Sequence, residues 1–170
     1  MSKPLALTIG VGEATGQSVC RLLANDYRVA MVARSGAVIN ALARELPDAR
    51  AYLCDVADRP RWSATLQTIR DELGLPSRLL MNTESAVWGA YSELPLDRFA
   101  QSFDVNVVSL LQLVQTMFPK QDDIPADTRL VVSSSPAAYE PAPVFMGLAP
   151  SRVAQRVLAE LLNESLAESG

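Results

Sequence analysis

The sequence predicts an α/β fold: a doubly wound parallel sheet of about five strands with helices on both faces. Three observations predict it. Short apolar runs alternate with longer helical stretches, a glycine-rich turn follows the first apolar run, and 170 residues with 49% hydrophobic and 20% charged side chains suit one globular domain. Right-handed crossovers then give the strand order 3-2-1-4-5, with the ligand crevice at the carboxyl ends of the first and fourth strands.

Each apolar run is short, as expected of strands that are covered on both faces. The expected strands are residues 5–9, 28–33, 49–54, 78–82 and 129–133. The expected helices lie near residues 14–25, 36–46, 59–73, 96–118 and 151–167. Asp58 followed by Pro60, and Ser35, are typical helix starts. We find no linker or repeat, so residues 1–170 are expected to form one domain.

Composition excludes several kinds of chemistry. The chain has no histidine, which rules out Ser/His triads, histidine-ligated metals and histidine acid/base catalysis. Cys20 and Cys54 lie among apolar neighbours and are expected to be buried, inert thiols rather than metal ligands. A net charge of −4 with scattered arginines argues against nucleic-acid binding. The absence of a long apolar run and of a signal-like start predicts a cytoplasmic protein without a membrane partner.

The turn after the first strand reads Gly-Val-Gly-Glu-Ala-Thr-Gly over residues 10–16. A strand, a glycine turn and a helix start are the parts of a pyrophosphate site, because backbone NH groups and the helix dipole attract phosphate. Glycine turns also serve as plain connections, and spacing alone does not decide between the two. The candidate cofactor-binding residues here are Gly10, Gly12, Ala14, Thr15 and Gly16.

This turn resembles the TGxxxGxG pattern of the short-chain dehydrogenase/reductase family, with Ile9 in place of threonine and Ala14 in place of the second glycine. Ala14 is expected to weaken binding if the turn requires a positive φ there. Over residues 5–166, the resemblance implies a Rossmann-like, NAD(P)-binding oxidoreductase that transfers hydride between carbonyl and alcohol. Other matching segments are Asp55-Val56, Asn82, Asp104-Val105-Asn106-Val107 and Ser133-Ser134-Ser135-Pro136-Ala137.

The second strand ends at Arg34-Ser35, where a site selective for NAD usually has an acidic residue. A guanidinium binds phosphate bidentately, so this pair predicts NADP as the cofactor, with NAD possible. The alternative is a solvated arginine at a strand end.

In relatives the pair corresponding to Asp55-Val56 lies along the adenine ring. Asn82 is the one match to the family's Asn-Asn-Ala-Gly segment, in which Glu84 stands where the glycine would be. The resemblance places this segment on the nicotinamide side of the cofactor, so Glu84 is expected to obstruct a normal nicotinamide pose.

The resemblance also assigns catalytic positions. Asn106 is expected to be buried, because residues 96–117 place it on an apolar helical face; in relatives it helps to hold a water, although a structural hydrogen bond is the alternative. Ser135 aligns with the serine that orients a substrate carbonyl. Leu148 and Arg152 stand where the family has the tyrosine and lysine of YxxxK. Carbonyl reduction is therefore expected to be severely impaired. Tyr139, in the loop after Ser135, is the alternative acid, although no lysine is available to lower its pKa.

No shift of alignment restores the motif, because the lysines, Lys3 and Lys120, do not lie four residues after a tyrosine. The competing hypothesis is an inactive descendant that acts as a nucleotide-binding, regulatory or assembly protein.

Family members usually continue beyond the fifth strand and its helix, so this chain is expected to be short at its C-terminal end. The fifth strand would then be an uncovered edge, and residues 153–162 spread apolar side chains widely around the last helix. We expect a homodimer formed through the long fourth and fifth helices. Contact with C-terminal residues outside this sequence is the alternative.

Overall fold

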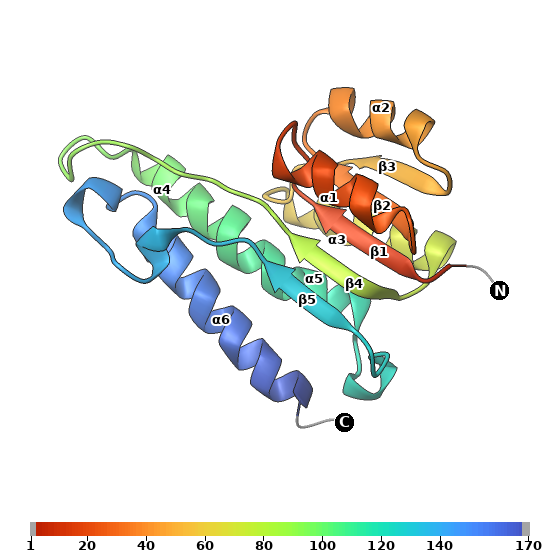
Figure 1. Cartoon of the computed structure of the whole chain (residues 1–170). Coiled ribbons are helices and arrows are strands. Elements are labelled where there is room, and N and C mark those ends of the chain that lie inside the picture. Colours follow the sequence, from red (N-terminus) through yellow and green to blue (C-terminus); the bar gives the residue numbers. More distant parts are fainter. Residues whose placement is uncertain (1–2, 168–170) are drawn as a thin grey trace.

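The computed structural model describes residues 3–167 and contains a five-stranded sheet of order β3-β2-β1-β4-β5 (Figure 1). All neighbouring strands are parallel, which confirms the predicted fold class and strand order. The chain reverses its direction of winding between β1 and β4, so their carboxyl ends flank the switch point of the sheet. The strands are β1 (Leu5–Ile9), β2 (Arg28–Ala33), β3 (Ala49–Leu53), β4 (Pro76–Met81) and β5 (Arg129–Val132).

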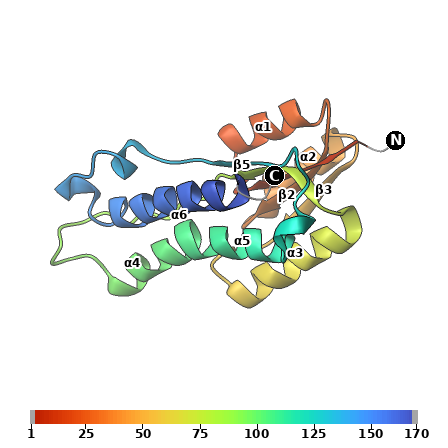
Figure 2. The ribbon, with the colours of Figure 1, turned by 90° about the horizontal axis from the view of Figure 1, so that it is seen from below.

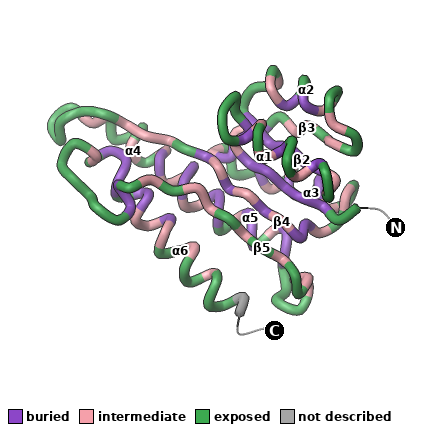
Figure 3. Tube along the Cα trace, viewed as in Figure 1, coloured by how far each residue is buried: buried purple, intermediate pink, exposed green. Residues whose placement is uncertain are grey.

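Helices cover both faces of the sheet (Figure 2). One apolar core joins the sheet to α1 (Thr15–Leu23) and α2 (Gly36–Glu45). The larger core joins it to α3 (Arg59–Leu73), α5 (Ser109–Met117) and α6 (Ala149–Ala167). β1 is buried along its whole length between the two layers (Figure 3). Among the described residues, no helix is both long and apolar enough to cross a membrane.

The predicted helix at residues 96–118 is three elements rather than one. α4 (Leu96–Phe103) leads into a π-helix, Asp104–Val108, which leads into α5. A π turn holds an extra residue and therefore rotates the apolar face. The predicted face is consequently wrong at its start, where Leu96 is 82% exposed. It is confirmed beyond the π turn, where the buried residues are Asn106, Leu110, Leu113 and Met117.

Local signals explain several boundaries. The Asp58 carboxylate accepts a hydrogen bond from the Arg61 NH at 3.2 Å and caps α3, with Pro60 in the first turn. Ser35 precedes α2 as expected, although its side chain makes no capping bond. Short 3-10 turns occupy Gln121–Asp123, Pro136–Ala138 and Pro143–Phe145.

The prediction of buried thiols is confirmed, because Cys20 and Cys54 are both free and buried. Burial raises the pKa of the Cys20 thiol to about 11 and also raises the pKa of Cys54. A thiol with a raised pKa is a poor nucleophile and a poor metal ligand at neutral pH. Within residues 3–167 there is no cluster of three acidic, cysteine or histidine side chains that could hold a metal.

Candidate functional site

A crevice with a volume of about 520 Å³ opens at the carboxyl ends of β1 to β4. Its walls come from the glycine-rich turn, from the residues that follow β2, β3 and β4, and from Val105 of the π-helix. The fold therefore brings together seven of the residues predicted to bind cofactor: Gly10, Gly12, Arg34, Ser35, Asp55, Val56 and Asn82. Ala14, Thr15 and Gly16 do not line the crevice and lie beside it at the start of α1.

The three glycines of the turn have different roles. Gly10 has φ +82°, and a Cβ there would lie only 2.6 Å from the Asn82 carbonyl carbon. Gly16 packs α1 against the strand end, since its Cβ would lie 2.7 Å from Val11 Cα. A Cβ on Gly12 would meet nothing within 4 Å, so the open space of the turn is at Gly12. Gly10 and Gly16 are required by the fold, and Gly12 leaves room for a ligand.

Ala14 needs no unusual backbone conformation. Its φ is −98°, so the expectation that alanine here could be forced to a positive φ is wrong. Ala14 is the N-cap of α1 and makes no side-chain capping bond. In the first turn of α1 the Gln17 NH donates to the Gly12 carbonyl at 3.1 Å, which leaves the NH groups of Thr15 and Gly16 for water or an anion.

The part of the crevice beside the ends of β2 and β3 carries polar groups that suit a nucleoside. Arg34 and Ser35 are exposed after β2, so the guanidinium can reach a ligand phosphate. One carboxylate oxygen of Asp55 accepts the Ala57 NH at 3.0 Å, which fixes the side chain beside the crevice.

Asn82 donates to the Gly10 carbonyl at 3.1 Å and holds the ends of β1 and β4 together.

Asn106 is completely buried, as predicted from its helical face. Its Nδ2 donates to the Ser85 carbonyl and to Ser151 Oγ, both at 2.9 Å, and its Oδ1 accepts the Ser85 NH at 3.1 Å. These bonds connect the π-helix to the loop after β4 and to α6. Asn106 thus makes structural hydrogen bonds, as the alternative interpretation of this residue expected. Its catalytic role stays a prediction.

Leu148, at the position of the family's tyrosine, is 4% exposed. It packs with Ala137 and Ala149, and the partly buried Ala86 and Phe145 pack against this small cluster. Ser135 lies close by in sequence, and its hydroxyl accepts the Ala137 NH at 3.3 Å to cap a 3-10 turn. The position that would present a phenol to a substrate is instead an apolar packing site.

Arg152 is 2% exposed and forms the centre of a polar cluster. Its guanidinium donates to the carbonyls of Ser133 (3.1 Å) and Thr83 (3.2 Å), to Gln155 Oε1 (2.7 Å) and to Glu84 Oε2 (2.9 Å). Glu84 and Arg152 are therefore an ion pair. The sequence indicated the two departures separately and did not predict that they pair.

The loops after β4 and β5 run beyond the sheet and meet each other (Figure 1). The Val87 NH donates to the Gly147 carbonyl at 3.4 Å, and Trp88 contacts Phe145 edge to face with 6.0 Å between ring centroids. A Cβ on Gly147 would lie 2.9 Å from the Val87 carbonyl carbon, so glycine permits this approach. The contact therefore joins the two loops at residues next to Leu148 in the chain.

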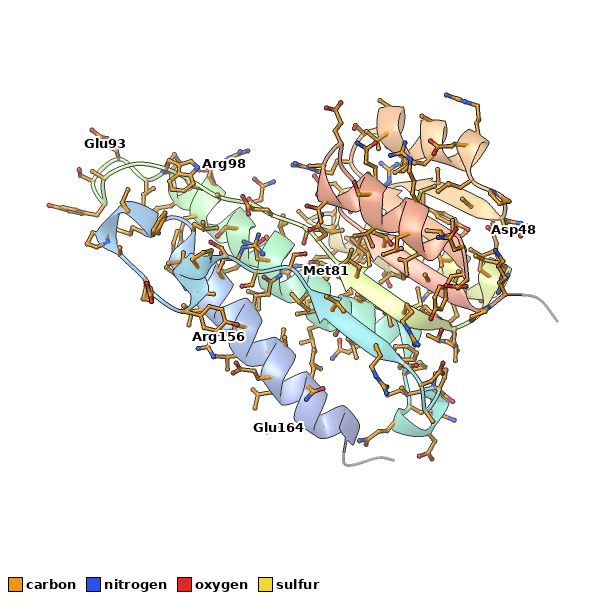
Figure 4. All side chains as sticks on the ribbon, viewed as in Figure 1. Asp48, Met81, Glu93, Arg98, Arg156 and Glu164 are labelled. Carbon is orange, nitrogen blue, oxygen red and sulfur yellow. The ribbon has the colours of Figure 1, made fainter. Side chains whose placement is uncertain are left out.

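Tyr139 does not line the crevice. Its side chain is 68% exposed, and the guanidinium of Arg156, labelled in Figure 4, lies 5.3 Å from the centre of its ring. This placement gives no support to Tyr139 as a replacement acid.

A second, larger hollow of about 840 Å³ lies beneath β5, between the end of α5 and the later turns of α6. Apolar residues such as Phe118, Ile124 and Leu130 line much of it. None of the predicted site residues lies there, so the crevice beside the glycine-rich turn is the candidate functional site.

An open parallel α/β sheet with a glycine-rich crevice at its switch point is the architecture of Rossmann-like proteins. The sequence profile described as short chain dehydrogenase matches residues 4–170. The chain belongs to the short-chain dehydrogenase family.

Relatives and solved structures agree with this assignment. L-xylulose reductase from Bos taurus is 32% identical over 111 residues, which cover 65% of this chain and 44% of that relative. A short-chain dehydrogenase from Streptomyces avermitilis superposes with a TM-score of 0.90 at 22% identity, covering 99% of this chain and 62% of that one. The Pseudomonas aeruginosa RhlG/NADP active-site complex superposes with a TM-score of 0.86 at 19% identity, covering 99% and 69%. The matched segment thus spans less than half the length of the L-xylulose reductases to which the chain is similar.

Proposed function

We propose that this chain binds an NADP-type dinucleotide and that its oxidoreductase chemistry, hydride transfer between carbonyl and alcohol, is severely impaired. The observation that carries the proposal is the pair of buried residues at the family's catalytic positions. Leu148 has no proton to donate, and Arg152 is already bonded to four acceptors. We also propose that residues 1–170 act as one nucleotide-binding domain.

The residues on the adenosine and phosphate side fit the cofactor. The open space at Gly12, the uncapped start of α1 and the carboxylate of Asp55 all border one crevice or lie beside it. Arg34 and Ser35 favour NADP over NAD, because a guanidinium pairs with a 2′-phosphate where an acidic residue would repel it. The complex of RhlG with NADP supports the same cofactor class. When bound, a nicotinamide cofactor would supply the hydride.

The residues on the catalytic side do not fit efficient turnover. Loss of a positioned general acid typically lowers the rate ~10²- to 10⁴-fold, which corresponds to roughly 3 to 5 kcal/mol of barrier. Ser135 can still donate its O–H to a carbonyl, because the turn uses only a lone pair of its oxygen, but this bond would orient a carbonyl and would not replace the missing acid. The chain therefore lacks a positioned group for the proton-transfer step.

Calorimetric titration of the whole chain with NADPH and with NADH tests the cofactor proposal. Saturable binding with NADPH the tighter ligand is expected, and Arg34→Ala should weaken NADPH binding by about 10- to 100-fold while leaving NADH nearly unchanged, since hydrogen bonds to charged groups contribute ~1.5–3 kcal/mol. Absence of binding by either nucleotide at millimolar concentration would refute the proposal.

The catalytic half of the proposal has a matched pair of variants. Leu148→Tyr with Arg152→Lys restores the two missing groups, and Leu148→Phe with Arg152→Lys adds a similar ring without a hydroxyl. Carbonyl reduction that returns with tyrosine only would show that the missing acid limits this chain. Equal activity of the two variants would contradict that explanation.

The second candidate is a protein without turnover that acts as a nucleotide-binding, regulatory or assembly subunit. The burial of Leu148 favours it, because a side chain that is 4% exposed and packed against Phe145 leaves almost no surface for a substrate. Saturable NADPH binding without reduction of any carbonyl compound, even by the tyrosine and lysine variant, would distinguish this candidate from an impaired enzyme.

We further propose a homodimer through the long helices, α4–α5 and α6, and a cytoplasmic location. Exposed apolar side chains on these helices support the dimer: Leu96, Leu111, Val157 and Leu161. Free, buried cysteines agree with a reducing compartment. Light scattering after size exclusion should give twice the chain mass, and Leu161→Glu should give the monomer. A monomeric parent chain would refute the dimer.

A further inference from the structure

We infer that the crevice is a site for adenine nucleotides with a 2′-phosphate, in which the second nucleoside of a dinucleotide adds little to the affinity. The inference deepens the proposed nucleotide site and rests on it.

A dinucleotide lies across the switch point of an open parallel sheet, with its pyrophosphate at the start of the first helix. The adenosine half therefore lies toward β2 and β3, and the second half must extend over β4 and β5. Here the crevice lining stops at Thr83 and Glu84 after β4. No residue of the described segment 133–152, which follows β5, lines it.

The Glu84–Arg152 pair marks this boundary. Glu84 lines the crevice with a side chain that is 60% exposed, while Arg152 beneath it is 2% exposed. Arg152 also binds the carbonyls of Thr83 and Ser133, so it ties the ends of β4 and β5 together. The pair fixes the Glu84 side chain at the rim that the second nucleoside would have to pass, where a glycine would leave open space.

Beyond the pair, the space is closed by packing. Leu148 lies in an apolar cluster against which Ala86 and Phe145 pack, and the Val87–Gly147 and Trp88–Phe145 contacts join the two loops beside it. A nicotinamide ribose placed there would have to separate these loops and leave its hydroxyl groups among apolar side chains. The adenosine side, in contrast, is open and carries the exposed cation Arg34.

The test compares three probes by calorimetry on the whole chain: adenosine 2′,5′-bisphosphate, NADP⁺ and NADPH. We expect the bisphosphate and both dinucleotides to bind within about threefold of each other. We also expect Glu84→Gly to strengthen NADP⁺ binding by about tenfold, or ~1.4 kcal/mol, and to leave bisphosphate binding unchanged. Glu84→Gln is the control, since it keeps the side-chain size and removes the charge. The bisphosphate titration itself reports whether each variant is folded.

The outcomes separate this inference from the proposed function. NADP⁺ that binds the parent chain about a hundredfold more tightly than the bisphosphate would overturn the inference and leave the dinucleotide site standing. Glu84→Gly without a selective gain for NADP⁺ would overturn the assigned role of Glu84. Failure of all three probes to bind would refute the nucleotide site, and the inference with it.

Discussion

Gly10 and Gly12 lie in the same turn but have different roles, so alanine at each position tests the fold and the ligand site separately. Gly10→Ala places a side chain at φ +82° and its Cβ 2.6 Å from the Asn82 carbonyl carbon. The backbone conformation costs ~1–2 kcal/mol and the displaced strand end ~1–3 kcal/mol, so unfolding should become easier by about 2–5 kcal/mol. Gly12→Ala meets no atom within 4 Å and should change stability by less than ~0.5 kcal/mol.

Urea denaturation followed by circular dichroism measures both values, and NADPH titration of each variant completes the test. Gly12→Ala should fold like the parent chain but bind NADPH more weakly, because its methyl group occupies the space left for the ligand. Equal loss of stability in the two variants would refute the division into a folding glycine and a ligand-facing glycine.

Three further predictions follow from buried groups. Asn106→Ala should cost about 2–4 kcal/mol in urea unfolding, because it leaves the Ser85 and Ser151 partners unsatisfied; a loss below 1 kcal/mol would contradict the assigned network. Gly147→Ala should separate the loops and shift the exposed Trp88 emission to the red, and an unchanged spectrum would argue against the contact. Cys20 is protonated in the fold up to about pH 11, so its stabilising effect is complete below its unfolded pKa near 9 and is lost as the pH rises toward 11. Stability should therefore fall by on the order of 2 kcal/mol between pH 8 and 11, and less in Cys20→Ala, which urea midpoints at both pH values would measure.

Much of the fold could be predicted because its signals are local. Apolar runs and the glycine turn gave all the strands within two residues, and Asp58 with Pro60 marked the start of α3. The π-helix at 104–108 was not predictable from a 3.6-residue period. The prediction that Leu96 shares a buried helical face with Asn106 was therefore wrong. Packing, and not periodicity, decides where such an extra residue is tolerated.

Only the part of the candidate site that follows from the strand order could be predicted from the sequence. Residues that follow parallel strands meet at one edge, so Arg34, Asp55 and Asn82 were placed correctly around one crevice. The bond between Glu84 and Arg152 joins positions 68 residues apart, and neither position alone indicates the other. The burial of Leu148 likewise depends on a loop contact that the sequence pattern does not encode.

The contact between the loops that follow β4 and β5 has a consequence for measured affinities. A long hydrogen bond and an edge-to-face ring pair hold the loops together outside the sheet, so this region should open locally at a smaller free-energy cost than global unfolding. Hydrogen exchange would then be faster in residues 83–95 and 139–147 than in β1. If only the open form accepts a whole dinucleotide, its apparent dissociation constant equals the intrinsic value divided by the open fraction. Mutations in the loops would thus tune binding without touching the ligand.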